Sequence, residues 1–180
     1  MKKIVKQVVG IDVAQKELVV SLGRMLEDWT PEVYAGKSFV NTLKGFEALQ
    51  NWVEKLTDTA ADLRYVMEAT GVYHESLAYF LDQKGLKISI VLPNKISNYM
   101  RTLEGKTITD QTAAQAITLF GLERKLDSWK RPQKVYKSLR QLNREREQII
   151  EERNMVKIIY MQKSQRLNQG RAVWSGSKKG

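Results

Sequence analysis

The alternation of apolar and polar positions in the first forty residues predicts three consecutive β-strands. Residues Ile4 to Asp12 form an apolar, β-branched run that ends at an acidic residue, which is typical of a buried central strand. Two further strands are predicted at Glu17 to Leu22 and Glu32 to Val40, separated by a polar turn region that includes Asp28 and Pro31. Three strands joined by short loops indicate an antiparallel meander.

After the meander, the apolar spacing indicates helices that alternate with strands. Between Leu43 and Leu56 apolar residues recur every three or four positions, which predicts a helix that Asn41 or Thr42 caps. The remaining predicted elements are a strand from Leu63 to Ala69, a helix from Glu75 to Lys84, a strand from Ile88 to Leu92 ended by Pro93, and a helix from Thr109 to Leu122. This order predicts an α/β fold of the RNase H-like (RuvC-like) type, a mixed five-stranded sheet with helices. Its first strand is central and its fourth lies beside the first.

A different pattern begins at Ser138 and predicts a long helix or a helical hairpin. Its apolar residues are spaced by threes and fours or their sums, as in imperfect heptads: Leu139, Leu142, Ile149, Val156, Tyr160 and Leu167. A helix packed on its own domain and a coiled-coil arm between subunits both remain open, and the narrow apolar seam favours the arm. We therefore expect an RNase H-like catalytic domain over residues 1–125, a basic coiled-coil or helical arm over 126–170, and a flexible tail over 171–180.

Charge divides the chain in the same way. Residues 1–120 contain 14 basic and 14 acidic residues, whereas residues 121–180 contain 16 basic and 6 acidic residues, so the net charge of +10 lies entirely in the last third. A neutral domain followed by a strongly basic extension is typical of proteins that bind nucleic acid. No run of 18 apolar residues and no signal-like start are present, so we expect no membrane contact and a cytoplasmic, nucleoid-associated protein.

The basic residues expected to contact nucleic acid begin in the loop before the last core helix and continue into the arm. They are Lys106, Arg124, Lys125, Lys130, Arg131, Lys134, Lys137, Arg140 and Arg144. Lys106 is equally well explained as a solvated loop lysine. Tyr73, Tyr99 and the single histidine, His74, are weaker candidates, because packing or simple surface exposure explains them better.

Three carboxylates occur where a solvated charge is not expected. Asp12 ends the first strand, Glu68 lies late in the fourth, and Asp110 opens the last core helix. In the predicted fold they converge on one edge of the sheet, and clustered carboxylates require a divalent cation to neutralise their repulsion. The chain has no cysteine and one histidine, so oxygen ligands and Mg²⁺ (or Mn²⁺) are expected. Taken singly, each carboxylate could be a cap, Asp110 in particular.

The sequence around these carboxylates resembles the DEDD transposases of the IS110 insertion-sequence type, which include pilin-gene invertase-like recombinases. The matching segments are Gly10 to Ala14 with Lys16, Glu68 to Tyr73, Lys106-Thr107 and Thr109 to Ala114. The resemblance covers about residues 5 to 165. It implies a RuvC-like domain, a coiled-coil extension, a further domain with a serine nucleophile, guidance by a structured bridge RNA, and action on DNA as a homo-oligomer, a dimer or tetramer.

Two departures from the family pattern bear on activity. The family has a fourth carboxylate three residues after the third, and here that position is Ala113. Since residues three apart share a helix face, Ala113 removes a ligand, and we expect weaker metal binding and impaired catalysis, from an engineered change or a degenerate copy. The serine-bearing domain is expected to follow residue 165, so the chain is interpreted as a fragment. None of Ser164, Ser175 and Ser177 is nominated as nucleophile.

The leading hypothesis is therefore the N-terminal catalytic domain of a transposase or recombinase that cleaves and exchanges DNA strands with Mg²⁺, guided by bound RNA. Two alternatives remain: a Holliday-junction resolvase-like nuclease of the same fold, and a non-catalytic RNA- or DNA-binding scaffold whose carboxylate site has decayed. A sugar-kinase fold also has a first strand ending in Gly-x-Asp, but it requires a second glycine-rich phosphate loop, which the sequence lacks.

Overall fold

Five strands form one mixed sheet in the computed structural model, which describes residues 3–69, 71–103, 110–132 and 134–176. The strands are β1 (Ile4–Val13), β2 (Glu17–Leu26), β3 (Pro31–Val40), β4 (Asp62–Glu68) and β5 (Ile88–Val91). Their order is β3-β2-β1-β4-β5; β1 pairs antiparallel with β2 and parallel with β4. The predicted meander, central first strand and adjacent fourth strand are thus confirmed.

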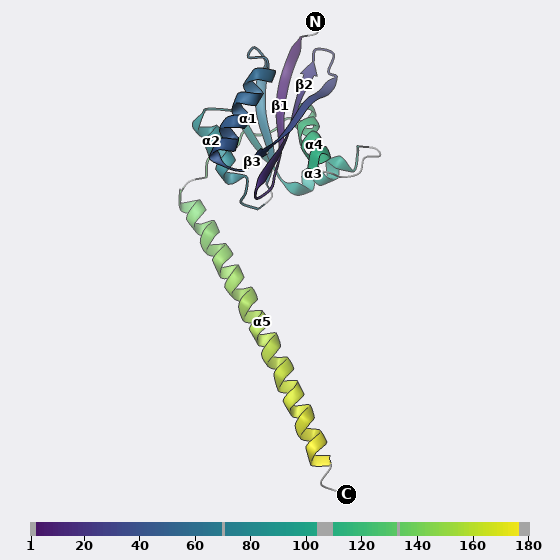
Figure 1. The fold of residues 1–180 in the computed structure, drawn as a ribbon, viewed down its shortest axis with the longest axis vertical. Coiled ribbons are helices and arrows are strands. Elements are labelled where there is room, and N and C mark those ends of the chain that lie inside the picture. Colours follow the sequence, from purple (N-terminus) through teal and green to yellow (C-terminus); the bar gives the residue numbers. More distant parts are fainter. Residues whose placement is uncertain (1–2, 70, 104–109, 133, 177–180) are drawn as a thin grey trace. The chain divides into compact units, whose positions relative to one another are not determined.

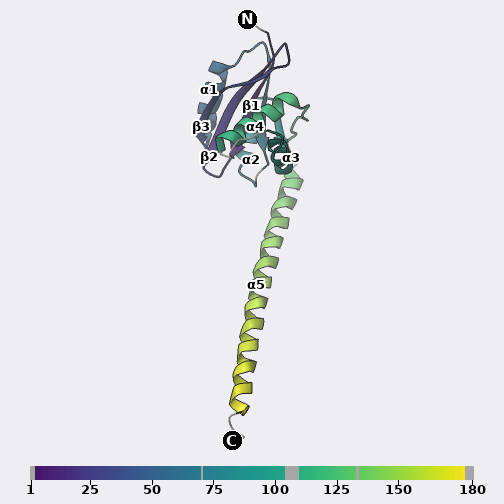
Figure 2. The same ribbon diagram turned by 90° about the vertical axis from the view of Figure 1, so that its right-hand side faces the viewer.

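Helices cover both faces of the sheet (Figures 1 and 2). On one face lie α1 (Leu43–Leu56) and α2 (Glu75–Gln83), whose apolar residues pack against the odd-numbered residues of β1. On the other lie α3 (Pro93–Met100) and α4 (Asp110–Glu123), which pack against Val8 of β1 and Val66 of β4. The sequence analysis missed α3, because it interpreted Pro93 only as the end of a strand, although proline at a first helical position also starts a helix.

The contact between α4 and β1 depends on two glycines. A Cβ on Gly10 would lie 2.2 Å from Thr118 Oγ1 and 2.7 Å from the Ala114 carbonyl oxygen, and a Cβ on Gly121 would lie 2.8 Å from Val8. Because Ala114 and Thr118 lie over Gly10 and Gly121 lies over Val8, α4 runs antiparallel to β1. The N-terminal end of α4 therefore points to the edge where β1, β3, β4 and β5 finish, which we call the C-terminal edge of the sheet.

At the opposite edge, the chain after α4 is held by polar groups of the sheet. We call residues 124–131 the edge segment. The Lys6 ammonium donates to the carbonyl oxygens of Leu122 (3.2 Å) and Arg124 (3.3 Å) and to that of Gly121. Burial, followed by the nearby Arg64 guanidinium, lowers the pKa of Lys6.

Hydrogen bonds from β4 and β5 continue along the edge segment. Arg64 donates to Ser89 Oγ (2.8 Å) and to the Leu126 carbonyl (3.3 Å), and the backbone N–H of Trp129 donates to the Ile88 carbonyl (2.8 Å). The edge segment therefore belongs to the first of two structural units, residues 1–131, and not to the arm beginning at residue 126 that the sequence analysis expected.

In the second unit, residues 132–180, the described residues form the helix α5 (Lys134–Gly176). Its 43 residues correspond to a length of about 65 Å. It begins four residues before the predicted Ser138 and includes the first six residues of the expected tail. Along it, apolar side chains such as Leu142 and Tyr160 are exposed, at 61% and 74%. Within the part of the chain that the structure describes, no helix has the length and apolarity needed to span a membrane.

Candidate active site

Asp12 and Glu68 lie next to one another at the C-terminal edge of the sheet. Strands β1 and β4 are parallel, and their last recorded pair is Ile11 with Met67, so the next position on each strand is Asp12 and Glu68. Side chains alternate between the two faces of a strand. Since Ile11 and Met67 face α1 and α2, Asp12 and Glu68 face the side covered by α4. Both are partly buried, and each has an interaction partner.

The third predicted carboxylate begins the helix that reaches this position. Asp110 is the first residue of α4, one helical turn before Ala114, which lies over Gly10. The four residues from Asp110 to Ala114 rise about 6 Å, nearly the distance from Gly10 to Asp12 along the strand, so the first turn of α4 comes level with Asp12. The side chain of Asp110 is outside the described part of the structure.

Ala113 lies in the same turn and is partly buried. It is four residues before Ile117, which packs against Val66 and Val91 of β4 and β5. Residues four apart share a helix face, so Ala113 belongs to the side of α4 that faces β4, the strand that carries Glu68. A carboxylate at position 113 would therefore face the same edge as Glu68.

The chemistry of these side chains fits a hard divalent cation. Two carboxylates fixed on adjacent strands provide the oxygen ligands that Mg²⁺ and Mn²⁺ prefer. Among the residues with described side chains, no three acidic or histidine residues form a group suited to a metal ion. The pair of Asp12 and Glu68 is thus what the described part provides, and Asp110 remains a predicted third ligand.

A residue that the sequence analysis considered only as a helix cap, Asn41, joins the loops around this edge. Its Nδ2 group donates to the carbonyl oxygens of Ala14 (2.9 Å) and Tyr73 (3.2 Å). The capping role belongs instead to Thr42, whose hydroxyl accepts from the Gly45 N–H. The local sequence does not show which of Asn41 and Thr42 caps the helix, because the hydrogen-bond partners of Asn41 are 27 and 32 residues away in the chain.

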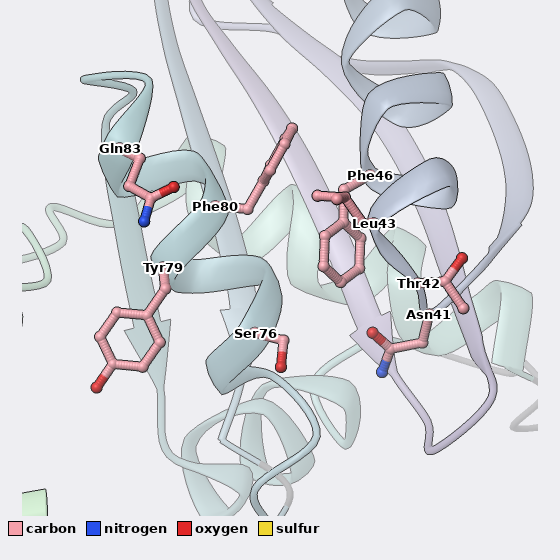
Figure 3. Close-up of a pocket in the computed structure, with 8 residues that line it drawn as sticks. All are labelled: Asn41, Thr42, Leu43, Phe46, Ser76, Tyr79, Phe80 and Gln83. Atoms are coloured by element: carbon pink, nitrogen blue, oxygen red, sulfur yellow. The ribbon is translucent and has the colours of Figure 1, made fainter.

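Beside Asn41, a groove of about 490 Å³ opens between α1 and α2 (Figure 3). Asn41 and Ser76 lie at the end of the groove where the two helices begin, and Gln83 lies toward the other end. Phe46 and Phe80 form its apolar floor, with ring centroids 5.6 Å apart. The groove therefore adjoins the C-terminal edge but holds none of the predicted carboxylates.

The predicted nucleic-acid contacts are divided between the two units. Four of them are exposed on the edge segment: Arg124, Lys125, Lys130 and Arg131. Arg131 already pairs with Asp82 (3.0 Å). Arg144 is exposed on α5. The side chains of three further predicted contacts on α5, and all of Lys106, lie outside the described residues; the three are Lys134, Lys137 and Arg140.

The two tyrosines considered for base stacking differ in exposure. Tyr99 is 7% exposed and packs edge-on against Phe120, with ring centroids 5.3 Å apart, and burial raises its pKa. Tyr73 is 40% exposed in the loop before α2. Tyr99 is thus a core residue, as its packing interpretation expected.

A solved structure with the same arrangement shows the class of fold. Thermus thermophilus RuvC, solved in complex with a Holliday junction substrate, is similar with a TM-score of 0.50 and 8% identity, over 68% of this chain and 99% of RuvC. At that identity the similarity concerns the fold, which is RNase H-like. The predicted fold class is therefore confirmed.

The sequence relationships show the family. The family model for DEDD transposases of the IS110 type, described as "Transposase", matches residues 9–162, so the chain belongs to that family. Pilin gene-inverting proteins are similar to it: that of Moraxella lacunata is 28% identical over 82% of this chain and 45% of the relative, and that of Moraxella bovis 30% identical over 64% and 37%. The chain spans less than half the length of these relatives. The resemblance stated from the motifs is confirmed.

Proposed function

We propose that this chain is the catalytic core of a transposase that cleaves and joins DNA strands with a divalent cation, Mg²⁺ or Mn²⁺, held by Asp12, Glu68 and Asp110. The observation that supports it is the placement of Asp12 and Glu68 at the ends of adjacent parallel strands, on the face where α4 begins at Asp110. Family membership supports DNA recombination as the class of activity.

Each part of the core has a role in this proposal. A bound divalent cation supplies charge neutralisation and polarisation of a scissile phosphate. The backbone ladder of β1 and β4 runs up to Ile11 and Met67, so Asp12 and Glu68 follow directly on two paired strands and start close together when the phosphate arrives. Lys16, in the turn after β1, and Lys95, on α3, are exposed cations at the same edge and suit contacts to the flanking phosphates.

The arm completes the proposal. We propose that α5 and the edge segment bind DNA and a structured guide RNA, because the charge excess of the chain is concentrated there. We also propose that α5 pairs with a second copy of the chain, as a dimer or tetramer. Its exposed seam of Leu142, Ile149 and Val156 repeats every seven residues, the spacing of a coiled coil.

The test restores the missing carboxylate. Ala113→Asp and the unaltered chain are incubated with labelled duplex, single-stranded and four-way-junction DNA, in Mg²⁺ and in chelator. Binding of Mn²⁺ is followed in parallel by electron paramagnetic resonance. We expect Ala113→Asp to bind Mn²⁺ more tightly and to cleave at least about 100-fold faster than the unaltered chain. Asp12→Asn in the Ala113→Asp background serves as the control and should abolish both gains.

Each outcome has a defined meaning. Gains in both readouts that Asp12→Asn removes support the proposal. Tighter Mn²⁺ binding without cleavage of any DNA would leave a metal site and overturn the catalytic assignment. Cleavage confined to the junction would favour a Holliday-junction resolvase-like nuclease over a transposase.

A second candidate function follows from Ala113 itself. A chain with an incomplete carboxylate set can act as a nucleic-acid-binding scaffold. For a scaffold, Ala113→Asp changes neither Mn²⁺ binding nor cleavage, whereas removal of arm charges weakens nucleic-acid binding as in the leading proposal. The comparison of Ala113→Asp with the unaltered chain therefore separates the two functions.

A further inference from the structure

Asn41 holds together the two turns that follow the candidate carboxylates. Its single amide donates to Ala14, two residues after Asp12, at 2.9 Å, and to Tyr73, five residues after Glu68, at 3.2 Å. Both hydrogens of the Nδ2 group are thus used, one for each turn. The two turns come from different strand ends and have Asn41 as a shared partner.

The backbone of Asn41 strengthens its hold on the first turn. Its N–H donates to the Lys16 carbonyl (2.9 Å), while the Ala14 N–H donates to the Glu17 carbonyl (2.9 Å). The turn between β1 and β2 is therefore closed on itself and attached to Asn41 at two points. In the loop before α2, Gly71 adopts a positive φ of 57° and the Glu75 N–H donates to the Val72 carbonyl oxygen.

We propose that Asn41 is a positioning residue for the metal site: by fixing the distance between the turns after β1 and β4, it holds Asp12 and Glu68 in place for a divalent cation. This inference rests on the proposed function. The β1–β4 ladder ends at Ile11 and Met67, one residue before the carboxylates. The carboxylates therefore lie between the end of the ladder and the amide that joins the two turns.

An asparagine suits this task for chemical reasons. Two carbonyl oxygens require two donors from one planar group, which a carboxylate cannot provide and a hydroxyl provides only once. Leucine branches at Cγ as asparagine does, with the same number of side-chain heavy atoms, but has no donor, so Asn41→Leu removes both hydrogen bonds without adding charge near Asp12. Asn41→Gln keeps the amide on a side chain one methylene longer.

The experiment uses the full chain and Mn²⁺ as the probe. Mn²⁺ binding is measured by electron paramagnetic resonance, and hydrogen exchange is followed in peptides that cover residues 12–18 and 71–76. The matched control is Asn51→Leu, the same change at an exposed position of α1. Asp12→Asn tests the metal site itself.

We expect Asn41→Leu to weaken Mn²⁺ binding about tenfold, the usual effect of losing a group that orients metal ligands. Exchange in both peptides should become faster, with a melting temperature within about 3 °C of the unaltered chain. Asn41→Gln should recover part of the affinity, and Asn51→Leu should change neither readout. A general loss of stability in Asn41→Leu would instead lower the melting temperature and speed exchange throughout the sheet.

The failures of the two proposals are distinguishable. If Asp12→Asn leaves Mn²⁺ binding unchanged, the metal site is wrong, whatever Asn41 does. If Asp12→Asn abolishes binding but Asn41→Leu does not weaken it, the metal site stands and the positioning role is overturned. Faster exchange without weaker binding would reduce Asn41 to a structural link between two loops.

Discussion

The sheet unit and helix α5 contain apolar residues for different reasons. In the sheet unit, Leu49 of α1 is fully buried against the strands, whereas Leu142 of α5 is 61% exposed. Burial of a leucine stabilises a fold, and an exposed row of apolar residues gains nothing until a partner covers it. The comparison teaches that the sheet unit encloses its own core, while α5 carries a row of apolar residues that the helix by itself leaves exposed.

Charge sharpens the same contrast. The first 120 residues are neutral, and the last 60 carry the whole excess of ten positive charges. In the sheet unit, charged groups such as Lys6 and Arg64 are used to hold backbone carbonyls. On α5, the described basic residues, such as Arg144 and Arg146, have exposed side chains.

The largest effect is expected where α4 lies against β1. Gly10→Val would place side-chain atoms within the backbone of α4, so we expect a loss of more than about 4 kcal/mol in the free energy of unfolding and loss of the native fold. Gly85→Ala is the control: no atom lies within 4 Å, and only its φ of 70° is strained, which costs about 1 kcal/mol. Circular dichroism and urea denaturation measure both. A natively folded Gly10→Val protein would contradict the close packing.

Truncation of a leucine to alanine should have different effects in the sheet unit and in α5. Leu49→Ala should lower the free energy of unfolding by about 2–5 kcal/mol, because it leaves a cavity in the core. Leu142→Ala should change it by less than about 0.5 kcal/mol but should weaken self-association in sedimentation experiments. Equal losses of stability would show that α5 packs on its own sheet unit.

A smaller loss is expected at the edge segment. Lys6→Met removes the ammonium that donates to the carbonyls at the end of α4, and we expect a loss of about 1–3 kcal/mol in the free energy of unfolding. Lys3→Met, which removes an exposed charge from the same strand region, should cost less than about 0.5 kcal/mol. Denaturation followed by tryptophan fluorescence measures the free energy of unfolding of both variants. Similar losses for both would show that the hydrogen bonds of Lys6 to the end of α4 do not stabilise the fold.

The smallest expected effect concerns one charge of the arm. Arg144→Gln should reduce the slope of log affinity against log salt for duplex DNA by about 0.9, the contribution of one phosphate contact. Glu147→Gln, three residues along the same exposed helix, should not reduce the slope. Fluorescence anisotropy at several salt concentrations provides the measurement. An unchanged slope for Arg144→Gln would remove that residue from the interface.

Local patterns were sufficient for the elements of the sheet unit that have strong periodicity. The apolar run of β1 and the acidic residue near its end predicted both a central strand and the place of Asp12. The position of Glu68 followed from the order of elements, because parallel neighbours finish at the same edge. The sequence pattern thus predicted the period of the apolar residues in each element and the order of the elements, both of which can be read along the chain.

The misses have a common physical cause. Helix α3 is short, and its first residue, Pro93, is compatible both with the end of a strand and with the start of a helix. Asn41 and the edge segment depend on hydrogen bonds between residues far apart in the chain, such as those of Arg64 with Leu126. Such partners are brought together only by the finished fold, so no local signal identifies them.

The close approach of α4 to Gly10 restricts the register that β1 can adopt when the chain folds. Strand residues on either side of this glycine carry large side chains, so a pairing displaced by one position would press Val9 or Ile11 into the helix backbone. A displacement by one residue would also turn every side chain of β1 to the opposite face, Asp12 included. Because Gly10 has no side chain, α4 can pack on β1 only when β1 is in the register that places Asp12 on the face covered by α4.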